Sequence, residues 1–271
     1  MARIQGIGRG IGERRMWRSI LQRLFLSIPF PTIVLLTVPS QAQQFNSDSW
    51  LSKDPGVATV ILTGGQRNSM LMTTFSLLPK WEFTAAAFIY NGDRDKATND
   101  GYSTMLYAKY MFYENKARTG GAAVKFGTGL RPGVISDVNA QTAFRTYWMN
   151  APVTVPLFGD KLSVDIMPGL SVTRNLVVTK PDLAWNFTYS GRVAWYPWSQ
   201  KWSLVGEAFG SAGQESSIPE IKAGFRWEPN RYQVWAFTYG KETHGDGTGD
   251  SKFEVGLMLF TPPFFCIWGC R

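Results

Sequence analysis

The spacing of the turns is the feature that most restricts the fold of this chain. After residue 50, tight breaks alternate with long polar breaks between hydrophobic segments. The tight breaks are Pro79-Lys80, Glu114–Thr119, Pro156–Asp160, Pro197–Gln200 and Glu228–Arg231. The long breaks are Asn91–Gly101, Arg131–Gln141, Arg174–Ala184, Ser211–Ser217 and Gly240–Ser251. Short connections at one end and long ones at the other are typical of outer-membrane β-barrels, with the short turns in the periplasm and the longer loops outside.

The hydrophobic segments between these breaks predict an all-β fold. We expect a transmembrane antiparallel up-and-down β-barrel of about twelve strands, with ten as the fallback count. An even count places both termini in the periplasm. The predicted strands are Val57–Leu62, Ser69–Leu78, Trp81–Tyr90, Tyr102–Tyr113, Gly121–Leu130, Thr142–Val155, Lys161–Thr173, Trp185–Tyr196, Trp202–Gly210, Ile218–Trp227, Tyr232–Tyr239 and Lys252–Phe260.

Apolar and polar residues alternate along these segments with a period of two. In 185–196 the apolar face carries Phe187, Val193 and Trp195, whereas the other face carries Asn186 and Arg192. This pattern predicts an apolar outer surface and a polar lumen. Five tryptophans next to the tight turns indicate an aromatic girdle at one membrane interface, with packing around the turns as the alternative. They are Trp81, Trp195, Trp198, Trp202 and Trp227.

The N-terminus is typical of an exported protein. Residues 1–23 carry six arginines and one acid, and the apolar run Leu24–Val38 and the polar Pro39–Ala42 follow. We therefore predict a signal peptide over 1–42, with Met16 as an alternative start. The remaining domains are a periplasmic lead-in over 43–55, an outer-membrane β-barrel over 56–260 and a C-terminal tail over 261–271. The strand that closes on Phe260 resembles the C-terminal signal read by the barrel assembly machinery.

Charge and cysteine content exclude several classes of function. Without residues 1–42, the chain has 22 basic and 19 acidic residues. Most of the apparent basicity therefore belongs to the signal peptide, and we expect no nucleic-acid partner. The chain shows no cofactor signature, and we expect no metal site. Cys266 and Cys270, its two cysteines, are either a local disulfide or two free thiols.

Ionisable residues occur singly in the predicted strands, on the inward face. Charges that face lipid are costly, so the lumen is their expected location. The predicted lumen-lining residues are Glu82, Lys109, Lys125, Arg145, Asp165, Arg192, Glu207, Lys222, Arg226 and Glu254. Their signs alternate through Arg145, Asp165, Arg192, Glu207 and Lys222. Such a ladder either cross-pairs and fills a narrow barrel, which we favour, or lines a selective pore.

A barrel hydrolase is a weaker alternative. Such enzymes need a nucleophile with an adjacent base, usually Ser and His near the membrane surface. The single histidine, His244, lies in a Gly- and Asp-rich loop, and no serine in a strand has an obvious base. We therefore expect no catalytic residues.

Three segments resemble a family of bacterial outer-membrane transporters linked with the meta-pathway of phenol degradation. They are Ser203–Gly210, Glu220–Trp227 and Gly245–Asp250, and the resemblance covers roughly residues 81–260. It implies a barrel that moves small hydrophobic or aromatic compounds, and it transfers no site residue.

The sequence as a whole predicts a monomer in the bacterial outer membrane that acts as a passive channel or transporter for small molecules. Its expected partners are the lipid bilayer, the barrel assembly machinery and a small solute. The main alternative is a structural or surface-interaction barrel with a plugged lumen, which binds through its outer loops.

Overall fold

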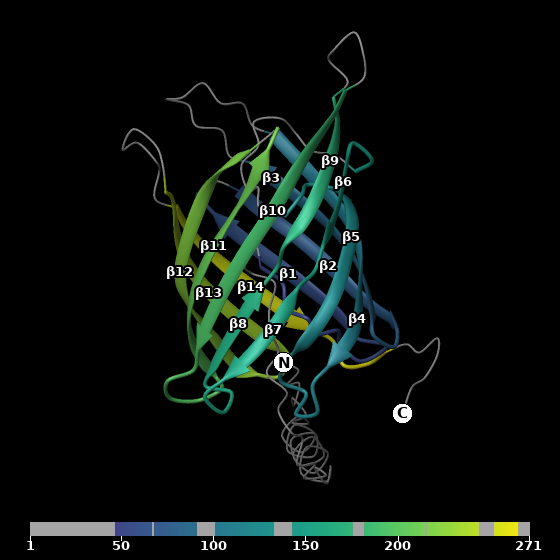
Figure 1. Ribbon diagram of the computed structural model, residues 1–271. Coiled ribbons are helices and arrows are strands. Elements are labelled where there is room, and N and C mark those ends of the chain that lie inside the picture. Colours follow the sequence, from purple (N-terminus) through teal and green to yellow (C-terminus); the bar gives the residue numbers. More distant parts are fainter. Residues whose placement is uncertain are drawn as a thin grey trace, which may run out of the picture. The chain divides into compact units, whose positions relative to one another are not determined.

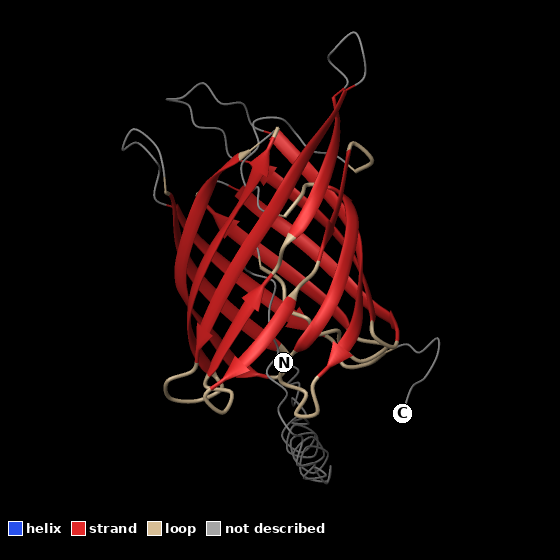
Figure 2. Ribbon diagram, viewed as in Figure 1, coloured by secondary structure: helices blue, strands red, loops and turns tan. Residues whose placement is uncertain are grey.

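The computed structural model describes residues 47–66, 68–90, 101–132, 143–175, 182–214, 216–243 and 252–264. These residues belong to one compact unit, Val38–Arg271. Regular secondary structure in the described ranges consists of β-strands (Figure 2). None of these ranges contains a helix long and apolar enough to cross a membrane.

Fourteen strand segments make up one antiparallel sheet (Figure 1). They are β1 (Ala58–Gly65), β2 (Asn68–Leu78), β3 (Trp81–Tyr90), β4 (Gly101–Glu114), β5 (Gly121–Gly129), β6 (Thr146–Asn150), β7 (Val153–Leu157), β8 (Leu162–Ile166), β9 (Gly169–Asn175), β10 (Asp182–Trp195), β11 (Trp202–Gly213), β12 (Ser217–Asn230), β13 (Gln233–Glu242) and β14 (Lys252–Phe260).

The sheet closes on itself as a twelve-stranded barrel. Segments β6 and β7 continue one strand, as do β8 and β9, because β5 pairs with both β6 and β7 and β10 pairs with both β8 and β9. Strand β14 pairs with β1 from Phe260 opposite Thr59 to Glu254 opposite Gly65, which closes the ring. The predicted up-and-down barrel of twelve strands is confirmed, and closure leaves no strand edge unpaired.

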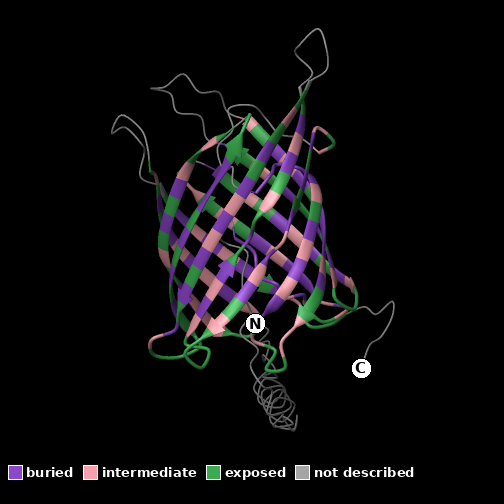
Figure 3. Cartoon of the chain, viewed as in Figure 1, coloured by how far each residue is buried: buried purple, intermediate pink, exposed green. Residues whose placement is uncertain are grey.

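Buried and exposed residues alternate along the strands of the barrel wall (Figure 3). The exposed, outward residues are largely apolar, and many of the buried, inward ones are polar. In β10, the outward side chains of Phe187, Val193 and Trp195 are exposed, whereas the inward side chains of Asn186 and Arg192 are buried. An apolar outer face is stable only against lipid, so this distribution is that of a membrane barrel and the reverse of a soluble one. On the outer face Trp202 stacks on Trp227, with ring centroids 5.4 Å apart, next to the tight turns.

The tight turns between strands use left-handed backbone conformations. Lys80, between β2 and β3, has φ 69°, and Asp160, between β7 and β8, has φ 66°. These turns coincide with the predicted breaks at Pro79-Lys80 and Pro156–Asp160. Most residues of four of the predicted long loops, all but Ser211–Ser217, lie outside the described residues.

Two neighbouring strands are interrupted at proline. The sequence predicts continuous strands over 142–155 and 161–173, but the structure divides them at Ala151-Pro152 and at Met167-Pro168. Proline has no N–H for the ladder, so each ring removes a hydrogen bond from the wall. The breaks lie side by side, since the Ala151 N–H donates to the Pro168 carbonyl at 2.9 Å. The first of these strands also begins later than predicted, at Thr146, because residues 143–145 form a turn.

Candidate functional site

Charged side chains in register form two rows on the inside of the barrel. In the first row, Asp165 lies opposite Arg192, Arg192 opposite Glu207, and Glu207 opposite Lys222. This row reproduces the predicted ladder from Asp165 onward. In the second row, Glu82 lies opposite Lys109 and Lys109 opposite Lys125. Period-two alternation places all these side chains on the lumenal face, where they can meet one another or a solute.

Close ion pairs hold both rows together. Arg192 Nη2 lies 2.7 Å from Asp165 Oδ2, and the Thr154 hydroxyl donates to Asp165 Oδ1 at 2.5 Å. Lys109 Nζ lies 2.6 Å from Glu82 Oε2. Because all of these groups are buried, each charge depends on its partner to offset the cost of leaving water. The rows are therefore rigid parts of the lumen wall.

The structure buries nine of the ten predicted lumen-lining residues. They are Glu82, Lys109, Lys125, Asp165, Arg192, Glu207, Lys222, Arg226 and Glu254. The tenth, Arg145, is half-buried in the turn before β6 and does not extend the ladder. Whether these residues line a path for solute stays a prediction.

The N-terminal segment 47–55 occupies the barrel lumen. The sequence predicts 43–55 as a periplasmic lead-in, and in the structure Ser47, Asp48, Ser49 and Trp50 are almost completely buried. Asp48 pairs with the inward side chains of Lys109 and Lys125, and the Ser47 N–H donates to the inward Glu207. The periplasmic assignment of 43–55 stays a prediction, and the structure adds that the described part of this segment contacts the inner face of the barrel. A polar lumen accepts polar side chains as water does, so composition alone does not separate the two locations.

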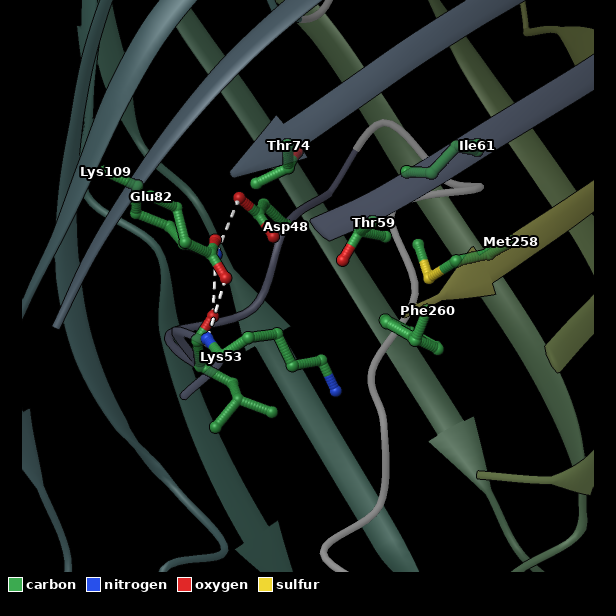
Figure 4. A pocket seen from close by; sticks show the side chains of 10 residues that line it. Asp48, Lys53, Thr59, Ile61, Thr74, Glu82, Lys109, Met258 and Phe260 are labelled. Carbon is green, nitrogen blue, oxygen red and sulfur yellow. Dashed lines mark hydrogen bonds and ion pairs between the residues drawn. The ribbon is translucent and has the colours of Figure 1, made fainter. Parts of the chain in front are cut away.

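Asp48 completes the charge balance of the second row (Figure 4). Its Oδ2 lies 3.1 Å from Lys125 Nζ and 3.5 Å from Lys109 Nζ. Burial raises the pKa of this carboxyl group, but Lys109 and Lys125 together lower it below its usual value. Asp48 is therefore ionised, and it bridges two lysines.

Backbone contacts fix the segment at both of its ends. The Ser47 N–H donates to Glu207 of the first row. The Lys53 N–H donates to Glu82 Oε1 at 2.8 Å, and Lys109 Nζ donates to the Leu51 carbonyl at 2.7 Å. The segment thus joins the two charged rows across the lumen. Burial lowers the pKa of the Lys53 ammonium to about 8, which Glu82 opposes.

Trp50 anchors the segment in a notch of the wall. Its side chain is 2% exposed and packs against Met111 and Ala123. A Cβ atom on Gly121 would clash with the Tyr113 carbonyl oxygen and would lie 2.8 Å from the Trp50 ring, so the neighbouring strand and the indole together require glycine here. The wall residues here are small where the ring lies, which gives the segment one defined position.

One side of the lumen is apolar, which the alternation of the strands did not predict. Ile61, Met72, Met105 and Met258 form a buried cluster with Tyr107, Trp148 and other residues. A cavity lies between this cluster and segment 47–55, bounded by Asp48, Lys109 and Glu82 on one side and by Ile61 and Met258 on the other (Figure 4). The lumen is therefore amphipathic.

The sequence contains one signal that could have located the segment. Lys109 and Lys125 are the place where the strand-to-strand alternation of sign fails, and like charges opposite each other are unfavourable. This pair of lysines therefore indicates a carboxylate from another part of the chain. Asp48 supplies it from outside any strand.

Other predicted features lie outside the described residues. These are the signal peptide 1–42, His244, Cys266 and Cys270, and the tail beyond residue 264. In the described ranges, no group of three or more His, Cys, Asp or Glu residues could hold a metal ion. The described start of the tail stays on the barrel, since the Thr261 N–H donates to the Ala58 carbonyl at 2.9 Å.

Known structures share the fold of this chain. No family model matches the sequence, and no curated protein matches it. An outer-membrane channel from Pseudomonas putida F1 superposes with a TM-score of 0.55 at 11% identity, over 78% of this chain and 98% of that one. The NanC porin gives a TM-score of 0.54 at 8% identity, over 74% and 98% of the two chains. The chain therefore has the fold of bacterial outer-membrane barrels, and its apolar outer surface fits that location.

Proposed function

We propose that this chain is a passive outer-membrane channel for small molecules, whose lumen is narrowed by segment 47–55. The observation that carries the proposal is a closed membrane barrel with two charged rows on its inner face. Segment 47–55, which is not a strand of the wall, lies in the lumen between these rows. A solute that replaces or displaces this segment would find polar and charged groups in a lumen that is otherwise enclosed. Gradient-driven passage needs nothing more.

The comparisons support this proposal through the fold alone. The resemblance to the transporters linked with phenol degradation adds small hydrophobic or aromatic compounds as the expected solutes, and the apolar side of the lumen suits such compounds. We further expect a monomer that is inserted by the barrel assembly machinery and has no enzymatic activity.

A structural barrel with a plugged lumen is the second candidate. Segment 47–55 is held in the lumen by contacts with buried charged side chains of the wall, which favours this alternative. In that case the segment is a permanent part of the core, and binding takes place through the outer loops.

Single-channel conductance in a planar bilayer separates the two candidates. The proteins to compare are the predicted mature chain, residues 43–271, and the same chain without 43–53. We expect brief, small openings from the first protein and larger, steady openings from the second, because the deletion removes the groups that join the two charged rows. Folding is checked by the resistance of each barrel to unfolding in detergent without heating. Silence from both folded proteins would overturn the channel and favour the plugged barrel.

A further inference from the structure

The inner wall has an uncompensated positive charge where β4 and β5 meet. Lys109 and Lys125 lie opposite each other in register, and both are buried. Lys109 already pairs with Glu82. Among the described residues, the carboxylate within 4 Å of Lys125 Nζ is that of Asp48. The wall by itself therefore lacks one negative charge, and it takes that charge from segment 47–55, which is not part of the wall.

The same place offers a hydrogen-bond donor that has no acceptor. Trp148 Nε1 is buried and has no hydrogen-bond partner among the described residues. Lys125 Nζ lies 5.9 Å from the centroid of the Trp148 ring and 4.4 Å from the centroid of the Tyr107 ring. A buried N–H without a partner is unfavourable unless a ligand or water satisfies it. An acceptor bound at Lys125 would be next to this donor.

An apolar surface begins directly beside the lysines. Tyr107 and Trp148 belong to the buried cluster that continues through Met105, Met72 and Ile61. The cavity next to Asp48 connects Lys109 with Ile61 and Met258. A molecule with a negative end and an apolar body would therefore find complementary surfaces at both ends.

We propose that Lys109, Lys125 and Trp148 form a binding site for a small organic acid with one carboxylate and an apolar body, and that Asp48 occupies this site in place of the ligand. The proposal deepens the proposed function, because it names the class of solute that the lumen binds. The ligand's carboxylate accepts hydrogen bonds from the two lysines and from Trp148 Nε1, while its body extends into the cavity toward Ile61 and Met258. The carboxylate of Asp48 and the carboxylate of the ligand then compete for one site.

Calorimetric titration of the folded chain 43–271 in detergent tests the site directly. The probes are hexanoate and hexanamide, which differ in charge and share the same apolar body. We expect Asp48→Asn to bind hexanoate at least about tenfold more tightly than the wild type, because the internal competitor has lost its charge. Hexanamide should not distinguish the two proteins. Acetate should bind the variant more weakly than hexanoate, because it lacks the apolar body.

A second substitution ties the binding to the lysine. In Asp48→Asn, the Lys125 ammonium has lost its carboxylate partner. Adding Lys125→Met removes this unpaired positive charge, so the double variant should fold. It should lose the gain in hexanoate affinity. The control adds Lys222→Met and Glu254→Gln to Asp48→Asn, which removes a lumenal ion pair elsewhere, and it should keep the gain.

Two outcomes would overturn the site: no tighter binding of hexanoate by Asp48→Asn, or equal binding of hexanoate and hexanamide. The site and the channel fail separately. Tighter hexanoate binding by a variant that conducts no ions would support the site and remove the channel. Conductance without this binding would leave the channel and remove the site.

Discussion

At the scale of single residues, buried ion pairs determine how much stability the barrel loses when a charged residue of the inner wall is substituted. Arg192 lies against Asp165, and both side chains are buried with Arg192 Nε also donating to Asp165 Oδ2 at 2.8 Å. A buried charge that loses its partner is far more costly than a pair that is removed as a whole. The wall should therefore tolerate the loss of both charges better than the loss of one.

We predict that Asp165→Ala lowers the free energy of unfolding by about 3–5 kcal/mol, because it removes the carboxylate that lies 2.7 Å from the buried Arg192 guanidinium. Asp165→Leu combined with Arg192→Leu should recover most of this loss. The measurement is equilibrium unfolding by guanidinium of the barrel refolded in lipid vesicles. An equal loss in the single and double variants would mean that packing, rather than charge, dominates at this position.

Residue-level patterns predicted which charges face inward, but not all of their partners. Period two in 161–173 and 185–196 was enough to place Asp165 and Arg192 on the lumenal face. The partner of Lys222 was not predictable, because Lys222 Nζ reaches Glu254 Oε2 at 2.7 Å across the intervening strand β13. Gly240 makes this possible, since a Cβ atom there would lie 2.8 Å from Lys222 Cγ. Such a contact depends on a glycine in the strand that separates the two charged residues.

At the scale of elements, the strands and the lumenal segment follow different rules. A strand such as β3, Trp81–Tyr90, was predicted with its observed bounds because each residue alternates between lipid and lumen. Segment 47–55 has no alternation, since the lumen surrounds it. Its polar residues Ser47, Asp48 and Ser49 have the composition of a solvated linker. Its location follows from charges and a notch on strands distant in sequence, which a local pattern does not contain.

We predict that Trp50→Ala loosens segment 47–55 and leaves the barrel intact, because the indole fills a notch on β4 and β5 and supports no strand pairing. Hydrogen exchange of the backbone at 47–53, followed by mass spectrometry, should accelerate by at least about tenfold, since removing a buried Trp side chain costs about 3–5 kcal/mol. Exchange in the strands should stay unchanged.

Trp198→Ala is the matched control for this substitution, because Trp198 is 78% exposed in the turn after β10. It should leave exchange at 47–53 as in the wild type. Faster exchange throughout the strands in Trp50→Ala would contradict a segment held separately from the wall.

At the scale of the whole molecule, the apolar outer surface indicates that lipid surrounds the barrel. The strand count was predictable because each hairpin has its own turn signal and closure needs no further information. The amphipathic lumen was not, because Met258 of β14 meets Ile61 of β1 and Met72 of β2 only after the barrel has closed. The outer surface of strands such as β10 follows the predicted alternation, which leads to a test of membrane depth.

We predict that an arginine on the outer face destabilises the barrel according to its depth in the bilayer. Leu170 is 51% exposed and lies opposite Met149 and Phe187, near the middle of long strands. Leu157 is 39% exposed and ends β7 at a tight turn. Leu170→Arg should cost about 2–4 kcal/mol and Leu157→Arg about 0–1 kcal/mol, because charge is most costly at the midplane. Guanidinium unfolding in vesicles measures both. Equal costs would show that lipid does not surround this face, since a surface in water makes no distinction between the two depths.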